Sequence, residues 1–154
     1  MKYIFSIILV FSFNLSFSQM TVSEMIRVYN MDMDQFETYA ISKGYDLSEF
    51  QQDKDFDGVK YGIGLGKETR HLSLFDEYYL NGKTVEFQTR IPNELLNIKT
   101  QLKNFGFKLY KSYLFNKKQQ VKLFRNKIFE LAITTFPIDD EHIYNVYMIT
   151  LNKK

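Results

Sequence analysis

Three carboxylates at alternate positions form the motif with the clearest chemical meaning in this chain. Asp53, Asp55 and Asp57 are followed directly by Gly58. Oxygen ligands at positions 1, 3 and 5 with a glycine at position 6 are how a calcium-binding loop surrounds a hard cation. In this register position 12, which should supply a bidentate carboxylate, is Gly64. Two interpretations stay open: a calcium site without its strongest ligand, and a solvated hairpin turn.

The two histidines do not assemble a recognisable catalytic set. His71 shares a strand face with Ser73, and His142 follows a short acidic run. A serine nucleophile also needs an orienting carboxylate and an oxyanion hole, and the sequence identifies neither. Zinc-protease and nucleophile-elbow motifs are also missing from the sequence. We therefore predict that the protein is not an enzyme, an expectation that a pocket gathering His71 with carboxylates would reopen.

A basic segment extends from residue 99 to residue 127. It holds nine lysines and arginines, no acidic residue, and several interleaved aromatic residues. Such a pattern can neutralise an anionic ligand, although aromatic core residues alternating with solvent-facing lysines would look the same. Because export is expected, an envelope glycan or lipid is a more suitable ligand than nucleic acid. The candidate residues are Lys108, Lys111, Lys117, Lys118, Lys122 and Arg125.

Charge is distributed unevenly along the chain. Residues 19–90 contain thirteen acidic and eight basic side chains, whereas residues 91–154 contain five acidic and eleven basic ones. The two halves therefore carry about −5 and +6 charges.

The N-terminal residues have the pattern of a secretory signal peptide. Lys2 precedes an apolar run from residue 3 to residue 13, and Ser16 and Ser18 provide small residues before a cut. We expect residues 1–18 to be removed near Ser18/Gln19, which gives a periplasmic or secreted protein with no later transmembrane segment. The chain has no cysteine, so it forms no disulfide and carries no lipoprotein anchor.

Periodicity predicts one helix-then-sheet pattern twice. Helical spacing ends at Gly44 and again at Gly106, where glycine suits a left-handed C-terminal residue. A shorter helix precedes the first of these, with Thr21 and Glu24 as a capping box, and Pro92 suits the start of the later one. Alternation predicts eight short strands, near 44–51, 59–66, 70–79, 84–91, 107–115, 120–125, 128–136 and 143–151.

The expected fold class is α+β: two tandem helix-then-four-strand units, residues 19–91 and 92–154, in one compact domain. Their antiparallel sheet would have the helices packed on one face. This plan, with Gly44, Gly106 and the similar segments 85–89 and 146–150, resembles the tandem repeat of the beta-lactamase-inhibitor-protein family. The resemblance implies a long antiparallel sheet under helices. The chain departs from that family because it has no disulfides and only one helix before the second sheet, and no residue role is transferred.

The last strand of each unit differs in its outward side chains. With 85 aligned to 146, the first unit presents Thr84, Glu86, Gln88 and Arg90, whereas the second presents Asn145, Tyr147, Ile149 and Leu151. An exposed apolar face indicates an interface. Alternation places the other face of the strands under the helices, and the residues predicted there include Leu47, Val59, Tyr61, Leu72, Leu74, Leu109, Val146 and Met148. The predicted binding surface consists of Tyr110, Leu114, Tyr147 and Ile149.

We therefore expect a secreted or periplasmic, non-enzymatic interaction module that binds an unidentified protein or a second copy of itself. The alternatives are a binder of anionic envelope material through the basic segment and, third, a module stabilised by calcium.

Overall fold

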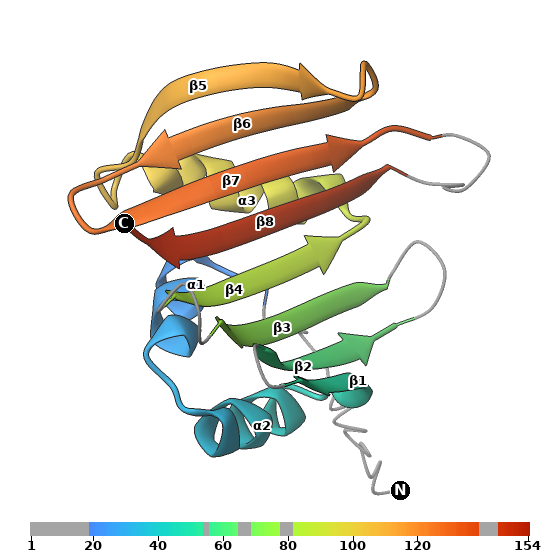
Figure 1. The fold of residues 1–154 in the computed structure, drawn as a ribbon. Helices are drawn as coiled ribbons and strands as arrows, with labels where there is room; N and C mark the ends of the chain where they lie inside the picture. The colour runs from blue at the N-terminus through green and yellow to red at the C-terminus, as the bar shows by residue number, and fades with distance from the viewer. Residues whose placement is uncertain (1–18, 54–55, 65–68, 78–81, 139–144) are drawn as a thin grey trace, which may run out of the picture.

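The structure is a computed structural model that describes residues 19–53, 56–64, 69–77, 82–138 and 145–154. In these ranges the chain forms three α-helices and eight β-strands (Figure 1). The predicted signal segment lies outside the described residues. In chain order the elements are α1 (Val22–Tyr29), α2 (Met33–Ser42), β1 (Asp46–Asp53), β2 (Phe56–Ile63), β3 (Arg70–Glu77), β4 (Gly82–Thr89), α3 (Pro92–Leu102), β5 (Lys108–Phe115), β6 (Gln119–Arg125), β7 (Phe129–Phe136) and β8 (Val146–Lys153).

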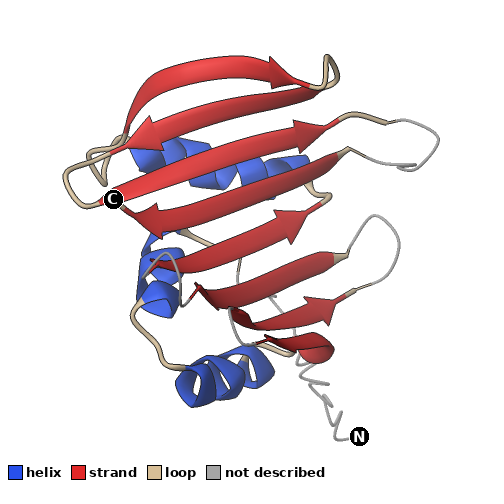
Figure 2. Ribbon diagram, in the orientation of Figure 1, coloured by secondary structure: helices blue, strands red, loops and turns tan. Residues whose placement is uncertain are grey.

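All eight strands belong to one antiparallel sheet (Figure 2). Their order is β1-β2-β3-β4-β8-β7-β6-β5, so two four-stranded meanders meet at their last strands. Strand β8 lies in the interior of the sheet, between β4 and β7, and β1 and β5 are the outer strands. The expected α+β class with an eight-stranded antiparallel sheet is confirmed. None of the helices in the described ranges has the length and apolarity needed to cross a membrane.

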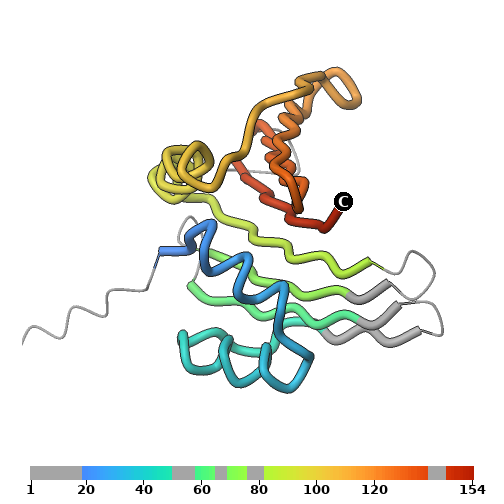
Figure 3. Tube along the Cα trace, turned by 90° about the vertical axis from the view of Figure 1, so that its left-hand side faces the viewer, coloured from blue at the N-terminus to red at the C-terminus, as the bar shows by residue number. Residues whose placement is uncertain are grey.

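The sheet is strongly twisted, as the turned view in Figure 3 shows. There β2, β3 and β4 cross the view, whereas β6, β7 and β8 run up it at a steep angle. Such a twist follows from the right-handed preference of each strand and accumulates from strand to strand.

The helices begin and end at local sequence signals. Thr21 and Glu24 form the predicted capping box of α1, and Pro92 is the first residue of α3. Gly44 and Gly106 have φ angles of 82° and 71°, in the left-handed region where glycine carries no Cβ penalty. The residue after each glycine donates its amide to the carbonyl five residues earlier, at 3.0 Å in both places. This bond is typical of a Schellman motif. The predicted end of α2 is confirmed, because its C-cap Lys43 directly precedes Gly44. Helix α3 already ends at Leu102, and a turn connects it to Gly106.

The core face of the sheet is the face that carries Val85 and Phe87 on β4. Leu151 and Ile149 of β8 are their direct pairing partners, so all four side chains share that face, and all are 0% exposed. Helix α1 packs against β4 and β8, and Val22 at its start donates its amide to Gln101 of α3 at 3.1 Å.

The orientation predicted for β8 was wrong. Tyr147 is 8% exposed and Ile149 is 0% exposed, whereas Val146 and Met148 lie on the opposite face. The prediction aligned β4 with β8 at a separation of 61 residues. At a separation of 62 residues, which is that of Gly44 and Gly106, Val85 and Phe87 correspond to the buried Tyr147 and Ile149. The alignment was therefore one residue out of step, and a shift of one residue exchanges the two faces of a strand.

The two outer strands each contain a bulge at the same position relative to the preceding glycine. The pairing register shifts between Leu47 and Glu49 in β1, and between Leu109 and Lys111 in β5. Leu47 is 59% exposed and Leu109 is 54% exposed, so their predicted place under the helices was wrong. A bulge bends an edge strand and turns its side chains away from the continuing ladder.

A buried ion pair fixes the start of α3 against the sheet. Glu94 is 1% exposed and accepts hydrogen bonds from Arg70 Nε and Thr89 Oγ1, each at 2.5 Å. Arg70 begins β3 and Thr89 ends β4, so three elements meet at one carboxylate. Its negative charge in the first turn also interacts favourably with the helix dipole.

Candidate functional site

Strand β5 is exposed along its whole length. It pairs with β6 on one side, and no described strand pairs with its other edge. All eight of its residues are exposed, which no other strand or helix shows in the described residues. The large apolar or aromatic side chains among them are Leu109, Tyr110, Tyr113, Leu114 and Phe115. The strand therefore presents unpaired backbone donors and acceptors together with apolar side chains on both faces.

A surface cluster holds the first half of β5 in place. The hydroxyl of Tyr110 donates to Oε2 of Glu130 at 2.6 Å, and Arg125 donates to the same oxygen at 3.3 Å. The guanidinium carbon of Arg125 lies 3.6 Å from the centre of the Tyr110 ring. The hydrogen bond to Glu130 raises the pKa of Tyr110. Tyr110 is thus ordered by its neighbours before any partner arrives.

The predicted binding surface is divided between the surface and the core. Tyr110 and Leu114 are 39% and 65% exposed on β5. Tyr147 and Ile149 lie in the core, so the exposure predicted for them was wrong.

The predicted anionic-ligand residues do not gather on one face. Lys111 pairs with Leu123, whereas Lys122, the neighbour of Leu123, pairs with Ser112, so Lys111 and Lys122 lie on opposite faces. Lys117 and Lys118 lie in the turn between β5 and β6, and Lys108 pairs with Arg125. Lys122 also pairs with Ile133, whose partner on β8 is Ile149, so Lys122 lies on the core face. Burial lowers the pKa of Lys99 on α3, and the charge of Lys122 lowers it further.

The acidic motif lies at the hairpin between β1 and β2. Asp53 is the last residue of β1 and Asp57 the second residue of β2, and residue 53 pairs with residue 56. Asp55 is outside the described residues, as are His142 and the acidic run before it. The calcium hypothesis stays a prediction.

His71 lies on the outer face, which is the face opposite the core face, and packs against a glycine. Gly62 is its direct partner on β2, and a Cβ atom built there would lie 3.0 Å from Nδ1 of the imidazole. This Nδ1 is buried and has no hydrogen-bond partner among the described residues. Burial lowers the pKa of His71, and the positive charges of Lys60 and Arg90 add to that effect.

Ser73, two residues further along β3, is 1% exposed on the same outer face. Its Oγ has no hydrogen-bond partner in the described part of the chain, so His71 does not activate it as a nucleophile. Its pairing partners are Lys60 and Glu86. Burial raises the pKa of Glu86, and the charge of Lys60 opposes that shift.

Two cavities adjoin His71. One of about 440 Å³ also includes Asp46 and Gly62, and one of about 180 Å³ includes Gln88 and Arg90. The larger cavity brings one carboxylate into the same cavity as the histidine. A carboxylate in close contact with the imidazole would raise the pKa of His71. The surroundings of His71 instead lower that pKa.

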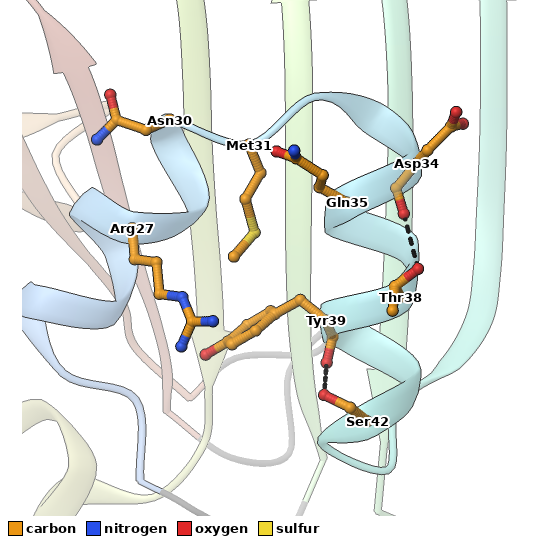
Figure 4. A pocket seen from close by; sticks show the side chains of 8 residues that line it. All are labelled: Arg27, Asn30, Met31, Asp34, Gln35, Thr38, Tyr39 and Ser42. Atoms are coloured by element: carbon orange, nitrogen blue, oxygen red, sulfur yellow. Dashed lines mark hydrogen bonds between the residues drawn. The ribbon is translucent and has the colours of Figure 1, made fainter.

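A wider groove of about 680 Å³ separates α1 from α2 (Figure 4). Several of its polar side chains already have partners within the chain. Tyr39 donates to Glu24 at 3.3 Å, and Ser42 and Thr38 donate to carbonyls of their own helix. Arg27 lies 5.5 Å from the centre of the Tyr39 ring. Sequence reasoning missed this groove, because no residue pattern marks the gap between two separately predicted helices.

Comparisons of the chain with protein-family models, curated proteins and solved structures return no match. The functional proposal therefore rests on the chain's own geometry.

Proposed function

We propose that this chain is a non-enzymatic interaction module, secreted or periplasmic, that binds an extended segment of a protein partner along the outer edge of β5. The observation that carries this proposal is the complete exposure of all eight β5 residues next to an edge unpaired within the described chain. An added strand would satisfy the outward N–H and C=O groups, and alternate side chains would supply specificity.

The side chains of β5 support such a partner in two ways. Leu114 and Phe115 are 65% and 51% exposed, so a bound strand would remove apolar area from water on both faces of the sheet. Lys108 and Lys111 belong to the strand itself, and no acidic residue occurs between 99 and 127. The partner segment should accordingly be acidic.

We also infer that the chain is a tandem repeat of one helix-then-four-strand unit, with units at residues 19–91 and 92–154. Three correspondences at a separation of 62 residues support it: the left-handed glycines 44 and 106, the amide bonds that follow them, and the bulges that begin at Leu47 and Leu109. This plan is again similar to the beta-lactamase-inhibitor-protein type of repeat. The similarity concerns architecture, and it transfers no activity.

Adjacent proline variants on β5 test the strand-binding proposal. Successive backbone N–H groups of a strand point to opposite edges, so in Tyr113→Pro and Leu114→Pro one proline removes an outward N–H and the other an N–H facing β6. The probe is an acidic eight-residue peptide of alternating valine and glutamate, with a valine–lysine peptide as control, followed by fluorescence anisotropy.

We expect the acidic peptide to bind the unmodified protein. The proline variant that keeps the original melting temperature should lose this binding. Equal binding of both peptides, or binding that survives the outward proline, would contradict the proposal.

The anionic-ligand alternative predicts a different result. The protein should then be retained at low salt on an immobilised sulfated polysaccharide such as heparin. It should be released steeply as salt increases, because exposed charges are screened beyond about 8 Å at 0.15 M salt. Retention should fall in Lys117→Gln/Lys118→Gln, a variant that leaves the edge of β5 unchanged.

A further inference from the structure

The opposite outer strand of the sheet, β1, has the complementary charge. Its sequence contains Asp46, Glu49 and Asp53 and no basic residue, whereas β5 contains Lys108 and Lys111 and no acidic residue. Residues 46–49 of β1 are all exposed, and β1 pairs with β2 alone among the described strands. The sheet therefore has one acidic edge and one basic edge.

The charges of the two edges also lie on the same face. Glu49 and Lys111 end a single row of directly paired residues that crosses the sheet through Lys60, Ser73, Glu86, Thr150, Ala132 and Leu123. Directly paired residues of antiparallel strands project to the same face. Glu49 and Lys111 consequently occupy the same level on opposite sides of the molecule.

Strand direction permits the sheet to continue from one molecule to the next. The sheet has eight strands, and every neighbouring pair is antiparallel, so β5 runs opposite to β1. A second copy placed beside β5 with its faces aligned therefore presents its β1 in the antiparallel orientation. If the row of paired residues that ends at Lys111 continues into the second copy, Glu49 of that copy lies directly opposite Lys111.

We propose that the partner strand of β5 is β1 of a second copy, so that molecules join head to tail into one continuous antiparallel sheet. This inference rests on the proposed function, because it names the occupant of the same edge. Pairing β5 with β5 would place lysines near lysines, and pairing β1 with β1 would place acids near acids. Both symmetric arrangements are therefore disfavoured by like charges on paired strands.

A head-to-tail contact uses two different surfaces, so it leaves a free edge at each end and does not stop at two copies. With a twist of about 20° per strand, each copy would be rotated by roughly 160° relative to the previous one. The expected assembly is an open, twisted ribbon whose length increases with protein concentration.

Charge reversal at the paired positions tests this assembly. Glu49→Lys and Lys111→Glu should each weaken association of the purified protein roughly tenfold, because each places like charges across the contact. An equimolar mixture of the two variants, and the double variant Glu49→Lys/Lys111→Glu, should both recover it. Asp34→Lys and Lys103→Glu, which are exposed on or beside helices, are matched controls and should leave it unchanged. The readout is weight-average mass by sedimentation equilibrium over a range of concentrations.

Several results would overturn the inference. These are a mass that stops at two copies, single variants that associate like the original protein, and a mixture that fails to recover. A chain that stays monomeric at every concentration, yet binds the acidic peptide on β5, overturns self-assembly and leaves the proposed function in place. A chain that stays monomeric and also fails to bind the acidic peptide overturns both self-assembly and the proposed function.

Discussion

Replacing Gly62 or Gly106 by alanine tests two different costs of an added Cβ atom: steric crowding at position 62 and backbone strain at position 106. A Cβ at position 62 would meet His71 at 3.0 and 3.2 Å, whereas a Cβ at position 106 would meet nothing within 4 Å. We expect Gly62→Ala to lower the free energy of unfolding by about 1–2 kcal/mol through overpacking. Removing the imidazole as well, in Gly62→Ala/His71→Ala, should recover part of that loss.

Gly106→Ala is the control for this cycle. Its φ of 71° costs about 1 kcal/mol for any residue with a Cβ atom, and His71→Ala should not change that cost. Urea unfolding of six proteins measures both effects: the unmodified protein, Gly62→Ala, Gly106→Ala, His71→Ala, and the two double variants that combine each glycine change with His71→Ala. A Gly62→Ala variant as stable as the original protein would show that the His71 imidazole moves aside without any loss of unfolding free energy.

His71 gives stability a defined dependence on pH. Its pKa in the folded protein is below its ordinary value, first because it is buried and then because Lys60 and Arg90 are positive. The unfolded chain therefore binds a proton more readily than the folded chain as pH falls below about 6.5. The contribution of neutral His71 is fully present above that pH and decreases below it. His71→Gln should flatten the decrease in urea-unfolding free energy between pH 7.5 and 5.5, and an unchanged slope would assign it to other groups.

At single positions, alternation predicts the core well only where a strand is regular. Val59, Tyr61, Leu72 and Leu74 are buried as expected. Leu47 and Leu109 are exposed because a bulge and an outer position act together, and neither can be read from hydrophobicity. The roles of Tyr110 and Leu114 as a binding surface stay predictions.

Among the elements, α3 depends on one side chain that lies outside the sheet's apolar pattern. Glu94→Ala removes the carboxylate that faces Arg70 and Thr89 in a buried site, and we expect a loss of about 3 kcal/mol in unfolding free energy. Glu94→Gln keeps the shape and an oxygen acceptor, so it should lose less. Asn93→Ala, exposed on the same helix, should change stability by less than about 0.5 kcal/mol. Equal losses at 93 and 94 would show that the ion pair contributes nothing specific.

Helix ends and strand positions were predictable because their signals are local. The capping box at Thr21 and the glycines at 44 and 106 act within a few residues of the helices they bound. The buried ion pair was not predictable, since Arg70 and Glu94 are 24 residues apart and nothing in either segment indicates the other. The same limit hid the groove between α1 and α2.

For the whole molecule, the pairing of β4 with β8 joins the two four-stranded meanders into one sheet. Phe87 and Ile149 are direct partners there, and both are 0% exposed. We expect Ile149→Ala to cost about 3 kcal/mol and to shift a single transition in which all eight strands unfold together. Thr150→Ala, on the outer face of the same strand, should have a much smaller effect. Circular dichroism and tyrosine fluorescence should give coincident curves, and separate transitions would contradict the expectation.

The strand order itself could not be derived from the sequence. Eight strands and their spacing follow from local alternation, but the choice of β8 as the neighbour of β4 joins segments more than 55 residues apart. The alignment that suggested two similar units was one residue out of step on β8, and that single residue reversed the face predicted for Tyr147 and Ile149.

The interior position of β8 has a consequence for the order of events during biosynthesis. A ribosome must complete residues 146–153 before the two meanders can be joined, because these residues supply the strand between β4 and β7. Until then the nascent chain exposes the apolar sides of two incomplete sheets and the unpaired backbone of β4 and β7. Such a chain should depend on chaperones throughout its synthesis and should complete its sheet only once the last strand becomes available.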